Sequence, residues 1–582
     1  MQKRWAVSKM TDQNLVEKLA ASLTIDPVLS HLLVQREIIT FSEARDFFRP
    51  SLDNLHDPFL IKDMDVAIRR IEQAIEKKER IMVYGDYDVD GTTSVALVYS
   101  LLRDFHSELE YYIPDRYKEG YGISFEGIDH AKSRGVGLII SLDCGIKAFS
   151  QIEYAQNQGI DFIVVDHHRP GEQLPKALAI LDPKRQECNY PYKELSGCGL
   201  GFKLAQAFYE KRRIPFQELE RFLDLVVVSI AADIVPITGE NRILAYFGLK
   251  RLNLNPRSGL ESIIFYNNVF KKSQSCEKTV FTREITINDL MYLIGPRLNA
   301  AGRIENGKTA VDLLLCDKMA DTHQLSQTIN ENNTERRSLD AQITKQALKM
   351  MSLDARLAQT KATVLFDPEW SKGVIGIVAS RLMEYYYRPT IILTQNNGVI
   401  TGSARSIKDF DIYNAIDSCS EFLDHFGGHK YAAGLSLKPE NLEGFMEAFH
   451  KVAEREVSEE MMIPEIEIDS ILDLPMIGGK FYRVLKQFAP FGPGNQNPYF
   501  LSEGCMLKGN PRIVGSNHLR FTITQPEKGN VELNAIAFQQ GQHLESLQPW
   551  KPFDVVYQIE ENEWNGKSSL QLNVKDLSFK VE

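Results

Sequence analysis

The sequence predicts an α/β protein in which two separate α/β units are followed by a β-rich barrel. Three observations lead to this fold class. Strand-length apolar runs alternate with helical segments between about residues 61 and 250, and such alternation is typical of a parallel sheet with crossover helices. A second α/β unit begins with ATVLFDPEW at 362–370. From about residue 463, short stretches of alternating apolar and polar residues replace this pattern.

A chain of 582 residues is too long for one hydrophobic core. We expect five regions in order, with boundaries near these residues: an N-terminal helical or connecting region (1–60), a first α/β domain (61–250), a helical connector (251–352), a second α/β domain (353–460) and a C-terminal barrel (461–582).

Composition excludes several classes of protein. No apolar stretch is long enough to span a bilayer, and the first residues contain no signal-peptide segment, so we expect a cytoplasmic protein without a membrane partner. The seven cysteines are scattered without a C-x-x-C pair, which indicates reduced thiols and no zinc knuckle. A net charge of −11 argues against indiscriminate nucleic-acid binding, so a nucleic acid would need a local basic channel.

The first predicted strand, Ile81 to Tyr84, leads into three aspartates at two-residue spacing, Asp86, Asp88 and Asp90. Gly91 and three hydroxyl residues follow, which is typical of a tight loop and a capped helix start. Three carboxylates in five residues repel one another strongly, and bound cations relieve that repulsion. A solvated acidic turn without a ligand is the alternative interpretation.

A calcium-binding loop also contains D-x-D-x-D-G, so that interpretation must be tested. It requires an acidic residue at its twelfth position, where this chain has Leu97. It also requires a preceding helix, where this chain has a strand-like run. The sequence therefore excludes a calcium loop.

Acidic or histidine residues follow three further apolar runs. Asp143 follows the predicted strand 138–142, and Asp166, His167 and His168 follow the predicted strand 162–165; a fourth run, LDLVVVSIAAD, ends at Asp233. Helices are predicted near 125–134 and 148–158, so the strands are parallel and their carboxyl ends meet at one edge. Four such endings on one edge of one sheet predict a metal site.

Carboxylates with one or two imidazoles favour Mn²⁺ or Mg²⁺ over zinc, and the number of carboxylates favours two ions.

The motifs GDYDVDG, SLDCGI, VVDHH and AADIVP resemble the four motifs of the DHH phosphoesterase superfamily, and their order and spacing are most similar to its RecJ branch of single-strand-specific exonucleases. The resemblance implies that Asp88, Asp90, Asp143, His167 and Asp233 are metal ligands and that Asp86 is a further ligand or near-ligand. It implies that Asp143 bridges two ions and that His168 faces the phosphate. Catalytic roles are thereby expected for Asp143, His167 and His168. Cys144 departs from the family, which commonly has Asn there; we interpret it as a small buried residue.

Several segments outside these motifs contain candidate substrate-binding residues. RYKEGYGIS (116–124) resembles a RecJ loop near the site, and in IGPRLNAAGRIENG (294–307) arginines lie among small residues that permit close approach to phosphates. A glycine-capped turn with surface arginines is the alternative for the second segment. TGSARS and FGGHKYAAGLS look like parts of the DHH-associated domain, and the glycine pair before His429 resembles an anion-binding nest of backbone N–H groups. The expected substrate-binding residues are Arg116, Arg297, Asn299, Arg303, Ser403, Arg405, Gly428 and His429.

The helical connector is predicted to join the two α/β domains through a long polar helix from 318 to about 352, with a thin apolar stripe of Leu325, Ile329, Leu339, Ile343 and Ala347. At the C-terminus, Asn565-Gly566 predicts a hairpin turn, and RecJ proteins have an OB-fold in this position. Aromatic residues there are candidates for base stacking or for the barrel core: Phe521, Phe538 and Trp564.

The resemblance, from about residue 60 to the end, implies a two-metal, single-stranded-DNA-specific 5′-to-3′ exonuclease in DNA repair and recombination. A single-strand-binding protein and a repair helicase are expected partners, and a monomer is expected. The first alternative is a DHH-type phosphodiesterase for short oligonucleotides or cyclic dinucleotides, for which the barrel would be unnecessary. The second is a non-catalytic DNA-binding scaffold, against which the complete set of predicted ligands argues.

Overall fold

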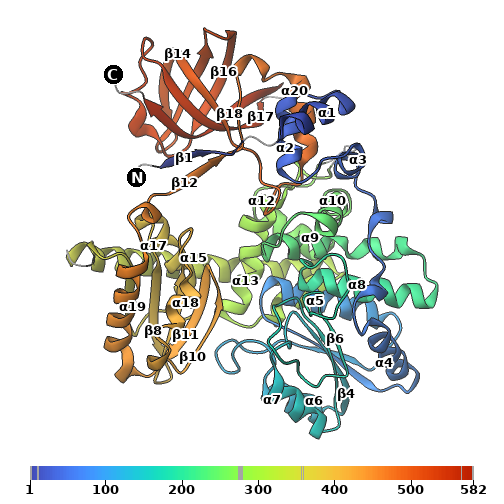
Figure 1. Cartoon of the computed structure of the whole chain (residues 1–582). Helices are drawn as coiled ribbons and strands as arrows, with labels where there is room; N and C mark the ends of the chain where they lie inside the picture. The colour runs from blue at the N-terminus through green and yellow to red at the C-terminus, as the bar shows by residue number, and fades with distance from the viewer. Residues whose placement is uncertain are drawn as a thin grey trace.

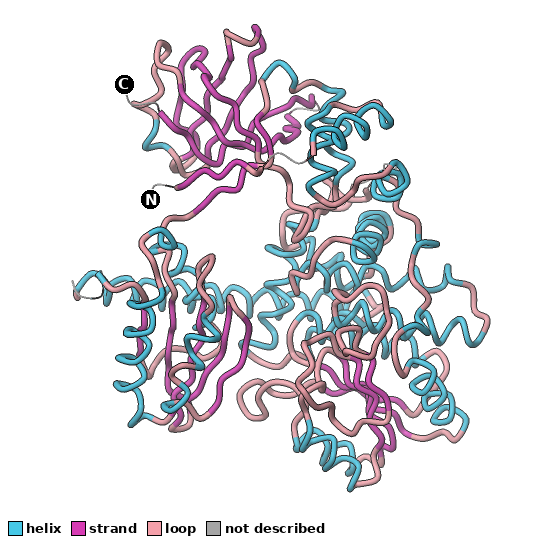
Figure 2. Tube along the Cα trace, viewed as in Figure 1, coloured by secondary structure: helices cyan, strands magenta, loops and turns pink. Residues whose placement is uncertain are grey.

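The computed structural model of the chain describes residues 3–9, 12–272, 279–354, 357, 359–564 and 567–579. Two α/β units lie side by side, and a barrel with adjacent N-terminal helices lies above them (Figure 1). Most strands are gathered into three groups, one in each α/β unit and one in the barrel (Figure 2). The predicted fold class is therefore confirmed.

The first α/β unit contains a five-stranded, entirely parallel sheet with strand order β3-β2-β4-β5-β6. Three strands lie at the predicted runs given above, and β3 lies at a fourth predicted run, Leu109–Ile113, whereas β6 is too short to stand out in the sequence. Parallel pairing brings the carboxyl ends of all five strands to one edge. The strands are β2 (Arg80–Gly85), β3 (Leu109–Tyr112), β4 (Val136–Leu142), β5 (Asp161–Val165) and β6 (Ala179–Leu181).

Alternate residues of these strands enter two hydrophobic cores on opposite faces of the sheet. One core lies against α6 (Phe125–Ser133) and α7 (Phe149–Asn157). The other, larger core lies against a layer of helices that continues to residue 315. These helices are α4 (Met64–Glu76), α5 (Val89–Arg103), α8 (Gly197–Arg212), α9 (Leu223–Ala232), α10 (Gly239–Leu254), α11 (Ser258–Phe265), α12 (Ile287–Asp289), the π-helix η4 (Leu290–Ile294), α13 (Gly295–Ile304) and α14 (Lys308–Leu315).

The apolar run before Asp233 is helix α9 and not the fourth strand that we predicted. It packs against α5, α8 and α10, and the residues from Leu223 to Ala231 are all buried. A helix buried on all sides loses the 3.6-residue alternation that distinguishes a helix from a strand in sequence. Asp233 therefore reaches the sheet edge from the helical layer.

The connector helix α15 (Met319–Leu353) joins the two α/β units through its predicted apolar stripe. Ile329 belongs to the large core of the first unit, whereas Ile343 and Ala347 belong to a core of the second unit. Leu325 and Leu339 are half-buried against the same two cores. One rigid helix thus contributes to both hydrophobic cores and fixes the spacing between the two units.

The second α/β unit has a mixed five-stranded sheet with strand order β10-β11-β9-β8-β7. Only β7 and β8 are parallel; the remaining pairs are antiparallel. The strands are β7 (Thr363–Phe366), β8 (Thr390–Asn396), β9 (Val399–Arg405), β10 (His425–His429) and β11 (Ala432–Leu437). The helices of this unit are α17 (Ile375–Tyr386), α18 (Ile412–Asp417) and α19 (Leu442–Glu456).

The C-terminal barrel closes because β14 pairs with both β15 and β17. Helix α20 (Gly479–Leu485) precedes it. The strands are β13 (Ser470–Ile471), β14 (Phe500–Val514), β15 (His518–Gln525), β16 (Gly529–Ala537), β17 (Phe553–Trp564) and β18 (Lys567–Phe579). The predicted turn at Asn565-Gly566 and the side chain of Trp564 lie outside the part that the structure describes.

The N-terminal helices share a hydrophobic core with the barrel. They are α1 (Gln13–Leu23), α2 (Pro27–Gln35) and α3 (Phe41–Phe48). Strand β1 (Arg4–Val7) pairs in parallel with β12 (Glu465–Ile468), which lies between the second unit and the barrel. Within the described residues, no helix has both the length and the apolar character needed to cross a membrane.

Candidate metal centre and neighbouring cations

The loop between β2 and α5 places three aspartates at the sheet edge. Asp88 is the N-cap of α5, and its carboxylate accepts a hydrogen bond from the Gly91 N–H at 3.0 Å. Asp90 is buried in the first turn, where it accepts hydrogen bonds from the N–H groups that begin α8 and from the Ser229 hydroxyl of α9. Asp86 is fully buried, and its Oδ2 has no hydrogen-bond partner among the described residues.

The loop after β4 places Asp143 opposite His167. Asp143 has a left-handed backbone with φ of 59°, and it is buried. The His167 Nε2 lies 3.1 Å from the Asp143 Oδ1, 3.5 Å from the Asp90 Oδ2 and 3.5 Å from the Asp233 Oδ2. One ring nitrogen therefore faces carboxylates from β4, α5 and the end of α9.

The two histidines after β5 have different environments. Burial lowers the pKa of His167, so its ring is neutral, which is the form that binds metals. Burial also disfavours the charged form of His168, but a hydrogen bond from its Nδ1 to the Asp166 Oδ1 at 2.8 Å outweighs this and raises the pKa to about 9. Burial would raise the pKa of Asp166, whereas His168 lowers it to about 2. His168 is consequently a cation at neutral pH, with the Tyr121 hydroxyl 3.4 Å from its Nε2.

The carboxylates of this edge repel one another in the absence of a cation. Burial, followed by repulsion from Asp90 and Asp88, raises the pKa of both Asp143 and Asp233 well above the ordinary value. Burial and Asp88 raise the pKa of Asp86 to about 8. Such shifts measure how unfavourable these charges are without a counterion.

The donor set fits divalent metal ions. Two overlapping groups have ligand atoms within 4.8 Å of one another: Asp143, His167 and His168, and Asp90, His167 and Asp233. Asp86 and Asp88 lie outside these two groups, although the buried Oδ2 of Asp86 has no partner among the described residues. Carboxylate oxygens and neutral imidazole suit Mn²⁺ and Mg²⁺.

Asp182 is an acidic residue of this edge that our sequence analysis missed. It follows β6, it is fully buried, and burial raises its pKa to about 7. Its Oδ1 accepts a hydrogen bond from the Lys184 N–H at 2.7 Å, and its Oδ2 has no partner among the described residues. Asp182 is thus a fourth acid in a loop that directly follows a strand of this sheet. The signal available in the sequence was the apolar run before it and the proline, Pro183, after it.

Cations from both α/β units gather beside Asp86 and Asp88. The Arg116 Nε donates to the Gly302 carbonyl at 2.9 Å, and the Arg303 Nη1 donates to the Gly373 carbonyl at 2.8 Å. Burial, followed by the charges of Arg116, Arg336 and Arg405, lowers the pKa of Arg303 to about 10. Burial and Arg116 lower the pKa of Lys372, a residue that sequence reasoning missed.

These four cations form what we call the arginine cluster: Arg116, Arg303, Lys372 and Arg405. None of the four forms an ion pair with an acid in the described part of the chain. The Arg405 Nη1 donates to the Ser403 hydroxyl at 3.2 Å, so both side chains project to the same side of β9. Gly376 lies against them, because a Cβ there would be 2.9 Å from the Ser403 hydroxyl and 3.1 Å from the Arg405 Nη2.

The structure does not support the predicted backbone nest before His429. Gly427 and Gly428 lie within strand β10, paired with Gly434 and Ala433, and their N–H groups do not converge on one point. Gly428 has φ of 151°, and a Cβ there would lie 2.3 Å from the Ala432 carbonyl oxygen, which explains the glycine without a ligand. His429 has an exposed side chain at the end of the strand, and its pKa is lowered by partial desolvation and by the charge of His168.

Arg297 and Asn299 have positions different from the arginine cluster. The Arg297 Nη1 donates to the Leu293 carbonyl and its Nε to the Asn330 side chain. The Asn299 Oδ1 accepts a hydrogen bond from the Val89 N–H at 3.1 Å and thereby holds the aspartate loop. Cys144 is buried, in agreement with its interpretation as a small core residue.

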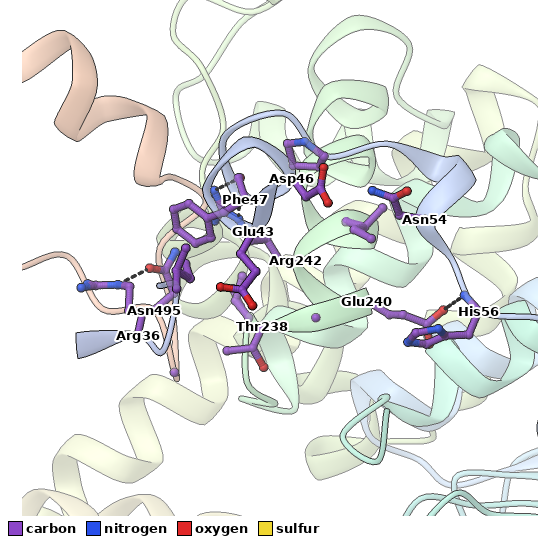
Figure 3. A pocket seen from close by; sticks show the side chains of 16 residues that line it. Arg36, Glu43, Asp46, Phe47, Asn54, His56, Thr238, Glu240, Arg242 and Asn495 are labelled. Carbon is purple, nitrogen blue, oxygen red and sulfur yellow. Dashed lines mark hydrogen bonds between the residues drawn. The ribbon is translucent and has the colours of Figure 1, made fainter. Parts of the chain in front are cut away.

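A cavity of about 690 Å³ lies away from the metal centre, between the N-terminal region, α10 and the loop at 494–495 (Figure 3). Arg242 lines this cavity. Its guanidinium carbon lies 3.7 Å from the centre of the Phe47 ring, and its N–H groups donate to the backbone carbonyls of Phe47 and of residues 487–490. Burial and then Arg36 lower the pKa of Arg242 to about 9. Because its donors are occupied by main-chain oxygens, this arginine joins the barrel to the first unit.

Family models match three segments of the chain. They are described as "DHH family, N-terminal domain" over residues 80–230, "DHHA1 domain" over 359–455 and "RecJ OB domain" over 468–576. The single-stranded-DNA-specific exonuclease RecJ of Bacillus subtilis (strain 168) is 36% identical over 577 residues, which cover 98% of this chain and 70% of that protein. The protein of the same name from Haemophilus influenzae is 32% identical over 574 residues, covering 95% and 96%.

Solved structures show the same architecture. The crystal structure of RecJ from Thermus thermophilus in complex with Mn²⁺ superposes with a TM-score of 0.83 and 27% identity, covering 100% of this chain and 80% of that chain. Its complex with Mg²⁺ gives a TM-score of 0.78 and 26% identity, covering 100% and 79%. From its sequence, its domain models and its fold, the chain belongs to the RecJ family of the DHH phosphoesterases.

Proposed function

We propose that this protein is a metal-dependent exonuclease specific for single-stranded DNA, which hydrolyses phosphodiester bonds from the 5′ end. One observation carries the proposal: a buried, mutually repelling set of carboxylates with a neutral imidazole lies directly beside a cluster of cations that have no acidic partner among the described residues. A phosphate bound between them, with metal ions among the carboxylates, neutralises both charges. The names of the relatives support this activity.

The residues of this chain have distinct roles in the proposal. Asp88, Asp90, Asp143, His167 and Asp233 would hold the metal ions, with Asp86 as a further ligand. Two divalent ions bound in such a site would supply an activated hydroxide and stabilise the charge on the transferring phosphate. His168, protonated at neutral pH and held by Asp166, donates a hydrogen bond or a proton to an oxygen of the scissile phosphate.

The arginine cluster supports the 5′ polarity. A terminal phosphate carries more negative charge than an internal diester, and the guanidinium fork can donate to two of its oxygens. Ser403 and Arg405 project from β9 to the same side, and the cluster lacks any carboxylate partner among the described residues. The 5′ end of a strand fits this arrangement because the DNA backbone ends at the terminal phosphate and does not continue past the arginine cluster.

The barrel supports a polymeric substrate over a cyclic dinucleotide. Aromatic faces on an OB-fold stack bases without sequence preference, and a two-nucleotide substrate needs no such surface. Single-stranded DNA is therefore the proposed partner. A single-strand-binding protein, a repair helicase, a monomeric state and a cytoplasmic place of action remain expectations of the same proposal.

The test uses single strands and duplexes labelled at either end, incubated with Mn²⁺ or Mg²⁺ and sampled over time. We expect mononucleotides to appear first from the 5′ end of single strands, and EDTA to abolish the reaction reversibly. Release from the 3′ end would contradict the polarity. Full activity after complete metal removal, or cleavage of a cyclic dinucleotide in preference to DNA, would contradict the function.

A further inference from the structure

Three basic residues follow the last three strands of the parallel sheet. Lys147 lies in the loop after β4, Arg169 in the loop after β5 and Lys184 in the loop after β6. The final residues of these strands are neighbours, with Leu142 paired to Val165 and Val165 paired to Leu181. The three loops therefore leave the same edge of the sheet side by side. We call these three residues the basic rim.

The basic rim has little internal neutralisation. Lys147 and Arg169 are exposed, and neither forms an ion pair or a side-chain hydrogen bond with a residue that the structure describes. Lys184 is half-buried, with its Nζ 3.3 Å from a carboxylate oxygen of the partly exposed Glu194. In a chain of net charge −11, such a local group of cations, two of which have no acidic partner among the described residues, creates a local attraction for anions.

The basic rim lies at the same sheet edge as the candidate metal centre. Lys147 is four residues after Asp143, Arg169 directly follows His168, and Lys184 is two residues after Asp182. A strand whose scissile phosphate lies at the metal centre would therefore have the rim beside it.

The rim and the arginine cluster lie beside different loops of the sheet edge. Arg116 donates to the Gly302 carbonyl, and Gly302 packs against Tyr87 of the loop after β2. Lys184 follows β6, which is the outermost strand on the other side of β4 and β5. The acidic centre thus has one group of cations beside the β2 loop and another beside the β5 and β6 loops.

We propose that the basic rim is a binding subsite for the phosphodiester backbone on the 3′ side of the scissile bond. This inference rests on the proposed function, in which the arginine cluster holds the 5′ end and the metal centre holds the scissile phosphate. The uncleaved part of the strand must then continue past the metal centre, where the rim supplies a cation from each loop. Flexible exposed cations suit a substrate of variable base sequence, because the backbone phosphates are the same in every nucleotide.

The experiment compares a triple variant, K147A/R169A/K184A, with a control of equal charge change, K77A/K132A/K176A. The control lysines are exposed and lie near the amino-terminal edge of the sheet: Lys77 precedes β2, Lys132 donates to the Gln158 carbonyl before β5, and Lys176 pairs with Glu153 and precedes β6. Both variants should unfold at the wild-type temperature. Values of kcat/KM are measured on a 5′-phosphorylated dinucleotide and on a strand of about 20 nucleotides.

On the long strand we expect the rim variant to lose about thirtyfold in kcat/KM, or about threefold for each exposed contact. On the dinucleotide it should match the wild type. The slope of log kcat/KM against log salt should become shallower by about 2, since each lost contact to single-stranded DNA removes about 0.7. The control variant should behave as the wild type on both substrates.

A neutral methylphosphonate placed one linkage 3′ of the scissile bond tests the contact directly. It should lower kcat/KM for the wild type but cause little further loss in the rim variant, because the cations it would meet are absent. Three outcomes would overturn the subsite. The first is that the losses in kcat/KM from the rim substitutions and from the methylphosphonate add. The others are that the rim variant loses equally on the dinucleotide and the long strand, or loses nothing on either. A wild-type protein that cleaves no strand would instead overturn the proposed function, and this would be evident before any variant is compared.

Discussion

The two α/β units contribute opposite charges to the candidate site. The parallel sheet presents buried aspartates from loops at its carboxyl edge, such as Asp143 after β4. The mixed sheet presents Ser403 and Arg405 from within strand β9, and His429 from the end of β10. Neither charge is balanced within its own sheet: the acids have raised pKa values, and the pKa of the Arg405 guanidinium is lowered by burial.

This difference shows how a metal and a phosphate can serve as the missing counterions of a protein. Divalent cations satisfy the acidic edge, and a phosphate dianion satisfies the arginines. In the proposed function, the substrate would contact both groups of charged residues at once. Substitutions in each group distinguish two independent sites from two halves of one site.

The largest effect is expected for Asp143→Asn at the acidic edge. Asparagine tolerates the left-handed backbone at this position, so the fold should be retained. The rate should fall by at least about a thousandfold, since the substitution removes a ligand between the proposed ions. The measurement is single-turnover cleavage of 5′-phosphorylated single strands in Mn²⁺, with thermal unfolding as the control. Retention of more than about a tenth of the wild-type rate would contradict the metal assignment.

Arg405→Ala at the opposite edge should lower kcat/KM by about ten- to a hundredfold, because a hydrogen bond to a charged group is worth about 1.5–3 kcal/mol. The loss should be greater on 5′-phosphorylated strands than on 5′-hydroxyl strands, which lack the group that the arginine binds. Arg405→Lys is the matched control: it keeps the charge and loses the bidentate fork, so it should recover part of the activity. Equal losses on both strand types would assign Arg405 to internal binding or folding.

The barrel lies away from both groups of charged residues, and a substitution there should have a smaller effect. Phe538 is half-exposed beside the His518 ring, whereas Phe521 is buried in the core shared with the N-terminal helices. Phe538→Ala should weaken binding of long strands about five- to tenfold, at the lower end for a stacked base, without a change in stability.

Phe521→Ala should instead cost about 3–5 kcal/mol of stability. Point substitutions are preferable to truncation after residue 463, because truncation would expose the apolar faces of α1 and α2. Fluorescence titration and thermal unfolding distinguish the two variants. Unchanged strand affinity in Phe538→Ala would remove this residue from the binding surface.

The last prediction concerns stability and not cleavage: it is the pH dependence of the metal-free protein. Asp86 has a pKa of about 8 when folded, against an ordinary value of 3.8. Because the folded pKa is the higher one, this group's stabilising contribution is complete below about pH 4 and is lost as pH rises toward 8. In EDTA, the stability of the wild type should therefore fall with pH by up to about 1.4 kcal/mol per pH unit more than that of Asp86→Asn.

Bound Mn²⁺ should remove most of that difference, because the ion favours the charged carboxylate. Thermal unfolding between pH 5 and 8 measures both conditions; the pH interval follows from the folded and unfolded pKa values of Asp86. Identical slopes for the wild type and Asp86→Asn in EDTA would show that Asp86 is not forced into a protonated state.

Local sequence alone was enough to predict the acidic edge. Strand, loop and helix start are contiguous around Asp86, Asp88 and Asp90, and a parallel sheet has only one edge for the carboxyl ends of its strands. The same reasoning placed Asp143 and His167 correctly. It missed Asp182 because a three-residue strand has too few positions to show a pattern.

Only the tertiary structure decided the nature of α9, the convergence of the cations and the position of the N-terminal helices. Burial on all sides removes the periodicity of α9, so its sequence resembles a strand. Arg116, Arg303 and Arg405 are separated by long stretches of chain and meet through the packing of α13 and the connector helix, which no local pattern encodes. Contiguous motifs are set by local backbone preferences, whereas the two units are brought together only after both cores have packed on α15.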